Sequence, residues 1–89
     1  MIILYSSKFK REYKKLSLKV KMRAEKKEIL FRKNPFDPQL GTHKLKGRLK
    51  EFWAFWIDEK NRIIFEFADN DVIWFHSAGD HAVYDLFNK

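Results

Sequence analysis

Metal-free cleavage of RNA needs three kinds of chemical group, and this 89-residue chain contains all of them. A base must act at the 2′-hydroxyl, an acid at the leaving 5′-oxygen and a cation beside the phosphorus. His43 and His81 suit the proton transfers because histidine titrates near neutral pH. Arg62 suits the third role because its planar guanidinium fits phosphate oxygens, and Tyr84 follows His81 closely. We therefore expect a catalytic site made of His43, Arg62, His81 and Tyr84.

Each of these four residues also has a structural interpretation, which the sequence leaves open. His43 could be a surface residue of a loop, and His81 could cap the C-terminal segment. Tyr84 could pack its ring without a catalytic role. Arg62 could pair with Glu66 along its own strand. The positions of these side chains in the fold must decide between the two interpretations.

Motifs for other kinds of catalysis are absent from the sequence. The chain has only three glycines and no glycine-rich phosphate loop. It has no HExxH metal motif, no GxSxG motif and no cysteine, so thiolate metal sites and disulfides are excluded. RNA cleavage by histidine and arginine uses no further group, so we expect neither a metal nor another cofactor.

The charge of the chain is unevenly distributed. Residues 1–50 contain 16 Lys and Arg against 4 acidic residues, whereas residues 51–89 contain 3 against 8. This asymmetry points to a polyanionic partner, with nucleic acid as the first candidate. The alternative is a solvated, lysine-rich helical surface that binds nothing. No apolar run approaches the roughly 18 residues that span a bilayer, so we expect a cytoplasmic protein without a membrane partner.

The first part of the chain predicts one strand and two helices. "MIILY" is typical of a short strand. Ser6 or Ser7 can cap the helix that follows, in which Phe9 and Tyr13 begin an apolar stripe. A second helix is expected at about 18–33, before the prolines of "NPFDP". Its expected buried residues are Val20, Ala24, Ile29, Leu30 and Phe31.

After Gly41 the apolar pattern has a period of two, which predicts strands. Four segments show it: "HKLKG", "EFWAFWID", "NRIIFEFA" and "DVIWFHSAG". "DEKN" and "DND" are turn sequences between them, and such short loops favour an antiparallel meander. In the third segment Ile63, Phe65 and Phe67 should face one side of the sheet, and Arg62 the other.

These elements predict a single α+β domain spanning residues 1–89. Its antiparallel, mostly meander sheet carries two N-terminal helices on one face, and Asp80 could cap a short C-terminal helix. His43 begins one strand and His81 follows another, so both could meet Arg62 at one edge of the face opposite the core. His76 is interpreted as a half-buried strand residue.

In their order and spacing, these segments resemble the RelE/StbE-type toxins of bacterial type II toxin–antitoxin systems, in the RelE/ParE superfamily. The resemblance rests on "FKREYKKL", "NPFDPQL", "HKLKG", the tryptophan Trp53, "NRIIFEF" and "AGDHAVY", and it runs nearly the whole chain. The family fold is an antiparallel sheet with a curved face and two N-terminal helices packed on the other. The elements predicted from periodicity agree with that fold.

The resemblance implies a role for each candidate residue. Arg62 matches the arginine that relatives place against the scissile phosphate, and His81 matches a catalytic histidine of several subfamilies. His43 falls where relatives carry a proposed base, and Tyr84 resembles a closing aromatic that stacks on a base or assists proton transfer. Which histidine is the acid and which the base stays open. RNA contacts are expected from the basic run, which we define as Lys44, Lys46, Arg48 and Lys50.

The function implied by the resemblance is that of a ribosome-associated, metal-independent mRNA endoribonuclease (an mRNA interferase). Its partners would be mRNA, the ribosome and a cognate antitoxin with an acidic binding segment, and operator DNA would be contacted only through the antitoxin complex. The alternatives are a ParE-like gyrase inhibitor and a degenerate toxin that only binds antitoxin and DNA. Gyrase-inhibiting relatives tend to lack the terminal histidine, which favours the nuclease. The chain departs from lysine-rich relatives at Ala54 and Phe55 and continues past many relatives with "DLFNK".

Overall fold

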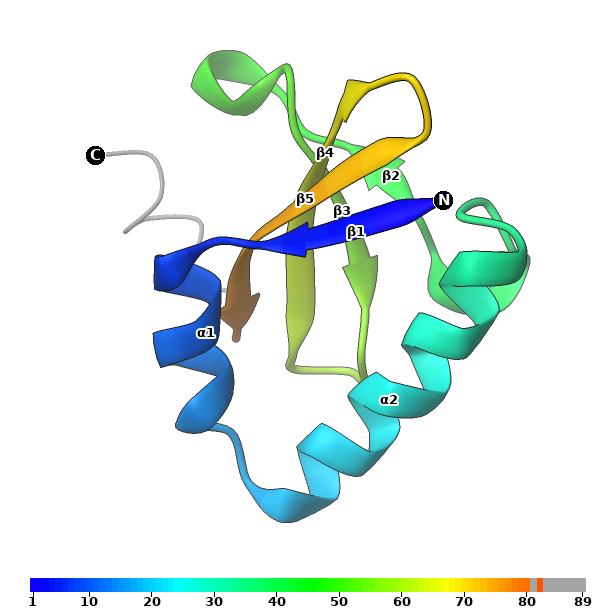
Figure 1. The fold of residues 1–89 in the computed structure, drawn as a ribbon. Helices are drawn as coiled ribbons and strands as arrows, with labels where there is room; N and C mark the ends of the chain where they lie inside the picture. Colours follow the sequence, from blue (N-terminus) through cyan, green and yellow to red (C-terminus); the bar gives the residue numbers. More distant parts are fainter. Residues whose placement is uncertain (81, 83–89) are drawn as a thin grey trace.

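Residues 1–80 fold into two helices and a five-stranded sheet (Figure 1). This computed structural model describes residues 1–80 and 82. The elements are β1 (Ile2–Tyr5), α1 (Ser7–Lys14), α2 (Leu18–Lys33), the 3₁₀ turn η1 (Pro38–Leu40), β2 (His43–Lys44), the 3₁₀ turn η2 (Gly47–Leu49), β3 (Trp53–Trp56), β4 (Arg62–Asp69) and β5 (Val72–Gly79). Within the described residues, neither helix is long and apolar enough to cross a membrane. His81, Tyr84 and the tail for which a helix was predicted lie outside them.

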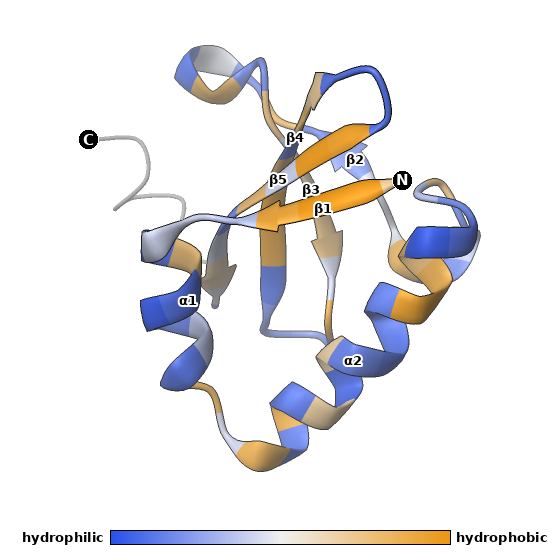
Figure 2. Cartoon of the chain, in the orientation of Figure 1, coloured by the Kyte–Doolittle hydropathy of each residue, from blue (hydrophilic) through white to orange (hydrophobic). Residues whose placement is uncertain are grey.

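Serine caps set where both helices begin. The Ser6 hydroxyl accepts a hydrogen bond from the Phe9 N–H at 3.0 Å, and the Ser17 hydroxyl accepts one from the Val20 N–H at 3.2 Å. Each satisfies an amide of the first turn that has no partner within the helix. α1 and α2 form a hairpin on one side of the sheet (Figure 1). Most of their length is hydrophilic, whereas β1, β4 and β5 contain hydrophobic stretches (Figure 2).

The sheet is mixed, with the strand order β1-β5-β4-β3-β2. The predicted meander from β2 to β5 is antiparallel throughout, and the α+β class is confirmed. β1 is the exception, because it pairs in parallel with β5. Parallel pairing requires a long crossover, and the helices together with β2 to β4 provide the chain length for it. β2 is shorter than predicted, since η2 begins at Gly47, whose φ is +67°.

An aromatic core lies between the helices and the sheet. The buried ring of Phe31 on α2 lies 5.0 Å from Phe55, 4.9 Å from Phe65 and 5.4 Å from Phe75, measured between ring centroids. Burial of large aromatic rings is the main driving force available to so short a chain. One predicted buried position is wrong, because Ile29 lies off the helix face that carries Phe31 and is 58% exposed. Phe67 lies on the predicted side of β4, beside Phe65 and Trp53, but is 42% exposed.

The other side of the sheet, which we call the distal face, carries polar and aromatic side chains. We define it by Trp56 on β3, Arg62 and Glu66 on β4, and Trp74 and His76 on β5. Strand alternation places these side chains opposite Phe55, Ile63, Phe65 and Phe75, which point into the core. Arg62 is therefore presented on a face that the helices do not cover.

Candidate active site

Arg62 lies at the start of β4, directly opposite Trp56 of β3. Its Cζ atom lies 4.1 Å from the centroid of the Trp56 ring, and its Nη2 donates to the Lys60 carbonyl at 3.5 Å. Stacking on an indole face attracts a guanidinium and restricts its orientation. Glu66 is engaged elsewhere, because its Oε1 lies 2.7 Å from His76 Nε2. Arg62 therefore does not form the ion pair with Glu66 that the sequence left open.

His43 begins β2, on the other side of β3 from β4, and pairs with Ala54 of β3. Its ring is exposed, and the ring centroid lies 6.2 Å from that of Trp56. Nδ1 lies 3.0 Å from the Gly41 carbonyl oxygen. Because a carbonyl oxygen only accepts hydrogen bonds, Nδ1 carries a proton, and in the neutral ring Nε2 is the basic atom. His43 and Arg62 thus both adjoin one indole ring.

Trp56 is a residue of this candidate site that sequence reasoning missed. It lies between Arg62 and His43, and it packs closely against Gly41. A Cβ atom on Gly41 would lie 2.5 Å from Trp56 Cδ1, so only glycine permits this approach. Gly41 also has a φ of +60°, which favours glycine. The available signal was the hairpin register, because the five residues between Trp56 and Arg62 place the two side chains opposite each other.

His81 and Tyr84 lie outside the described residues, so their predicted roles stay predictions. The described part of β5 ends at Gly79, which is the strand partner of Arg62. Asp80 follows, and its carboxylate accepts a hydrogen bond from the Ala82 N–H at 2.9 Å. The chain therefore enters the segment that contains both residues from a point beside Arg62.

The basic run lies around β2 and η2 and is exposed. Lys44 pairs with Trp53, and its Nζ lies 5.9 Å from the Trp53 ring centroid. Trp53 packs against the core, so alternation places Lys44 on the opposite side of β2 from His43. Lys46 and Lys50 flank the turn η2, and Arg48 lies within it. The structure therefore places the four cations near β2 but on more than one side of it.

His76 belongs to a separate cluster on the distal face. Besides its contact with Glu66, its ring lies 5.2 Å from Phe52 and 6.2 Å from Trp74, measured between centroids. The His76 side chain is 22% exposed, which confirms the prediction of a half-buried strand histidine. His76 therefore links β4 and β5 to Phe52, which lies between η2 and β3.

The turn between β3 and β4 is fixed by Asp58. Its Oδ1 accepts hydrogen bonds from the Lys60 N–H at 2.8 Å and the Asn61 N–H at 2.7 Å, and Arg23 lies 3.5 Å from Oδ2. Burial raises the pKa of Asp58, but these donors and the Arg23 charge outweigh burial, so the pKa is lowered from its ordinary value. An ionised Asp58 therefore helps to hold the register that places Trp56 opposite Arg62.

Comparisons with solved structures show which proteins share this fold. The sequence itself matches no protein-family model and no curated protein. YafQ from E. coli strain BL21(DE3) superposes with a TM-score of 0.75 at 21% identity, over 92% of this chain and 94% of YafQ. A YoeB/ParE toxin from Agrobacterium tumefaciens gives 0.78 at 13% identity, over 91% and 99%. YafQ in the E. coli DinJ–YafQ complex gives 0.66 at 19%, over 91% and 93%. The chain has the fold of these toxins.

Proposed function

We propose that this protein is the toxin of a type II toxin–antitoxin system and that it acts as a metal-independent endoribonuclease on mRNA at the ribosome. One observation carries the proposal: His43 and Arg62 flank the same Trp56 ring on the distal face. The proposal is further supported by the fold, which is shared with the YafQ and YoeB toxins, and by the sequence resemblance to RelE/StbE-type toxins.

In the proposed reaction the RNA 2′-hydroxyl attacks the adjacent phosphorus. The Nε2 atom of neutral His43 accepts the hydroxyl proton as O2′ bonds to phosphorus. The Arg62 guanidinium donates hydrogen bonds to the phosphate oxygens, whose negative charge increases in the transition state. His81 gives a proton to the leaving 5′-oxygen, and Tyr84 orients the nucleotide. The products are a 2′,3′-cyclic phosphate and a 5′-hydroxyl.

The partners follow from the charge of the molecule. The basic run binds phosphates of mRNA, and the lysine-rich helices bind those of ribosomal RNA, without reading their sequence. A cognate antitoxin covers these basic surfaces with an acidic segment, and operator DNA is reached only through that complex. The E. coli neighbour YafQ has been crystallised with DinJ, which supports a protein partner for this fold.

Growth arrest on expression tests the proposed site in cells. Wild type should stop growth, and Arg62→Ala should relieve the arrest because it removes the cation beside the phosphate. Arg11→Ala provides a matched control, since Arg11 is an exposed arginine on α1. Circular dichroism must show that both variants remain folded. Full toxicity of a folded Arg62→Ala variant would contradict the site, and DNA damage without RNA cuts would instead support the gyrase inhibitor.

A further inference from the structure

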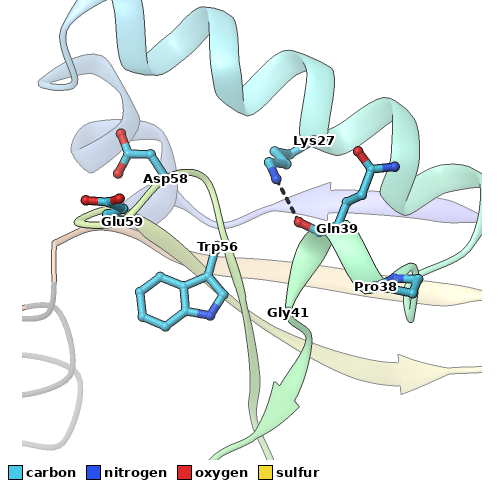
Figure 3. Close-up of a pocket in the computed structure, with 7 residues that line it drawn as sticks. All are labelled: Lys27, Pro38, Gln39, Gly41, Trp56, Asp58 and Glu59. Carbon is cyan, nitrogen blue, oxygen red and sulfur yellow. Dashed lines mark hydrogen bonds between the residues drawn. The ribbon is translucent and has the colours of Figure 1, made fainter.

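A pocket of about 520 Å³ adjoins Trp56 on the side of η1 and α2 (Figure 3). Trp56 and Gly41 form part of its wall, Lys27 and Gln39 lie on one side, and Glu59 lies on the other. This volume is within the range of roughly 300–1,000 Å³ that is typical of small-molecule sites. The indole is thus shared between the Arg62 contact and this pocket.

The pocket offers a ligand one hydrogen-bond donor group, on Lys27, and one acceptor group, on Glu59. Lys27 Nζ donates to the Gln39 carbonyl at 2.7 Å, and an ammonium group has two further N–H donors. Asp58 is occupied by its turn and by Arg23. Glu59 is exposed, and its carboxylate has no partner among residues 1–80 and 82. Glu59 is therefore the acceptor that a ligand can use.

We propose that this pocket binds a guanine base of the RNA substrate, next to the phosphate that Arg62 contacts. Guanine presents N1–H and N2–H donors to one carboxylate, and its O6 accepts from an ammonium group. Adenine, cytosine and uracil lack the paired donors that would satisfy Glu59. Trp56 provides the aromatic surface on which unpaired RNA bases stack. The assignment of the base to a substrate strand depends on the proposed function.

The charges of the pocket favour a base over a phosphate. Two carboxylates, Asp58 and Glu59, lie on one side of it and repel a phosphate group. A neutral base avoids this repulsion and places its own phosphate outside the pocket, towards Arg62. The pocket and the catalytic pair therefore divide one nucleotide between them, with Trp56 between the two halves.

Titration of the purified protein with nucleoside monophosphates tests this proposal without any cleavage. The probe is the NMR signal of the Trp56 indole N–H, identified by its loss in Trp56→Phe. Guanosine monophosphate should shift that signal at concentrations about tenfold lower than adenosine, cytidine or uridine monophosphate, the discrimination expected of one bidentate base contact. Glu59→Gln should abolish the preference, whereas the matched control Glu51→Gln on an exposed site beside η2 should retain it.

The outcomes separate this proposal from the proposed function. Equal shifts by all four nucleotides, or a guanine preference that survives Glu59→Gln, would overturn the guanine pocket while leaving the nuclease assignment in place. Guanine-selective binding by a protein whose folded Arg62→Ala variant stays toxic would support the pocket and overturn the catalytic assignment. In cells, cuts by the wild type should adjoin guanine, and Glu59→Gln should remove that bias without abolishing cleavage.

Discussion

His43 is oriented by its hydrogen bond to the Gly41 carbonyl, which leaves Nε2 as the basic atom. His43→Gln removes the group that accepts the 2′-hydroxyl proton. We expect the rate of RNA cleavage to fall by about 10²–10⁴-fold, the usual contribution of a general base. The KM for RNA should change little, because no phosphate contact is lost.

Single-turnover kinetics on ribosome-bound mRNA measures this effect. His76→Gln is the matched control, because His76 belongs to the cluster with Glu66 and is not assigned to catalysis. The control should keep its cleavage rate and lose some thermal stability. If His43→Gln cleaves as fast as the wild type, another group must be the base.

At the scale of elements, Gly41 joins the parts of the site. Its carbonyl orients His43, and the space left by its missing side chain admits Trp56. Gly41→Ala should therefore lower both stability and activity. Gly47→Ala is the matched control: both glycines have positive φ, +60° and +67°, but an added Cβ at Gly47 meets nothing within 4 Å.

Both substitutions carry the cost of alanine in a left-handed backbone conformation. The difference between their free energies of unfolding therefore measures the clash with Trp56. Urea unfolding should show Gly41→Ala to be less stable than Gly47→Ala by about 1–3 kcal/mol, the usual cost of overpacking. Equal stability of the two variants would mean that Trp56 moves aside at no cost, and Trp56 would then not be a fixed support for Arg62.

The β3–β4 turn gives the molecule a specific sensitivity to acid. Because the pKa of Asp58 is lowered in the folded state, its ionised form stabilises the fold above the unfolded pKa of 3.8. This contribution is lost as pH falls from that value through the folded pKa. Asp58→Asn should therefore be less stable than wild type at pH 7 and should lose less stability between pH 7 and pH 3.

Urea unfolding of both proteins at the two pH values measures this linkage. In thermal melts, the melting temperature of the wild type should exceed that of Asp58→Asn at pH 7, and the difference should be smaller at pH 3. A parallel loss of stability in wild type and variant would show that other carboxylates cause the acid sensitivity, and that Asp58 does not hold the turn through its charge.

Local patterns were enough to predict the elements and the face that carries Arg62. A serine cap indicated where α1 begins and the prolines after Asn34 indicated where α2 ends, and strand alternation placed Arg62 on the sheet face away from Ile63. The hairpin register could have placed Trp56 opposite Arg62, but its contact with Gly41, which ends η1, could not be predicted from local patterns. Parallel pairing of β1 is likewise a long-range property, because its partner β5 begins only at Val72.

At the scale of the whole molecule, cations predominate in the first half of the chain, and η2 projects beyond the sheet (Figure 1). Binding of single-stranded RNA should weaken as salt rises, because bound phosphates release counterions. Lys46→Gln, in the basic run, should reduce the slope of log affinity against log salt by about 0.7, the value for one phosphate contact.

Fluorescence anisotropy at several salt concentrations measures this slope. All proteins carry Arg62→Ala as well, so that the RNA is not cleaved during the measurement. Lys10→Gln on the exposed surface of α1 is the comparison. Its slope should stay unchanged. An unchanged slope for Lys46→Gln would remove Lys46 from the RNA contact surface.

The central claim is that His43 and Arg62 act on one RNA phosphate, and the chemistry of the new RNA ends tests it most directly. Translating ribosomes are assembled and then incubated with purified wild type or Arg62→Ala. Free metal ions are chelated to the extent that the ribosomes stay intact. The chemical groups at the new 5′ and 3′ ends of the mRNA are then identified. The account predicts 5′-hydroxyl and 2′,3′-cyclic phosphate ends with the wild type and no new ends with the variant. New 5′-phosphate ends, or cuts that persist in Arg62→Ala, would contradict it.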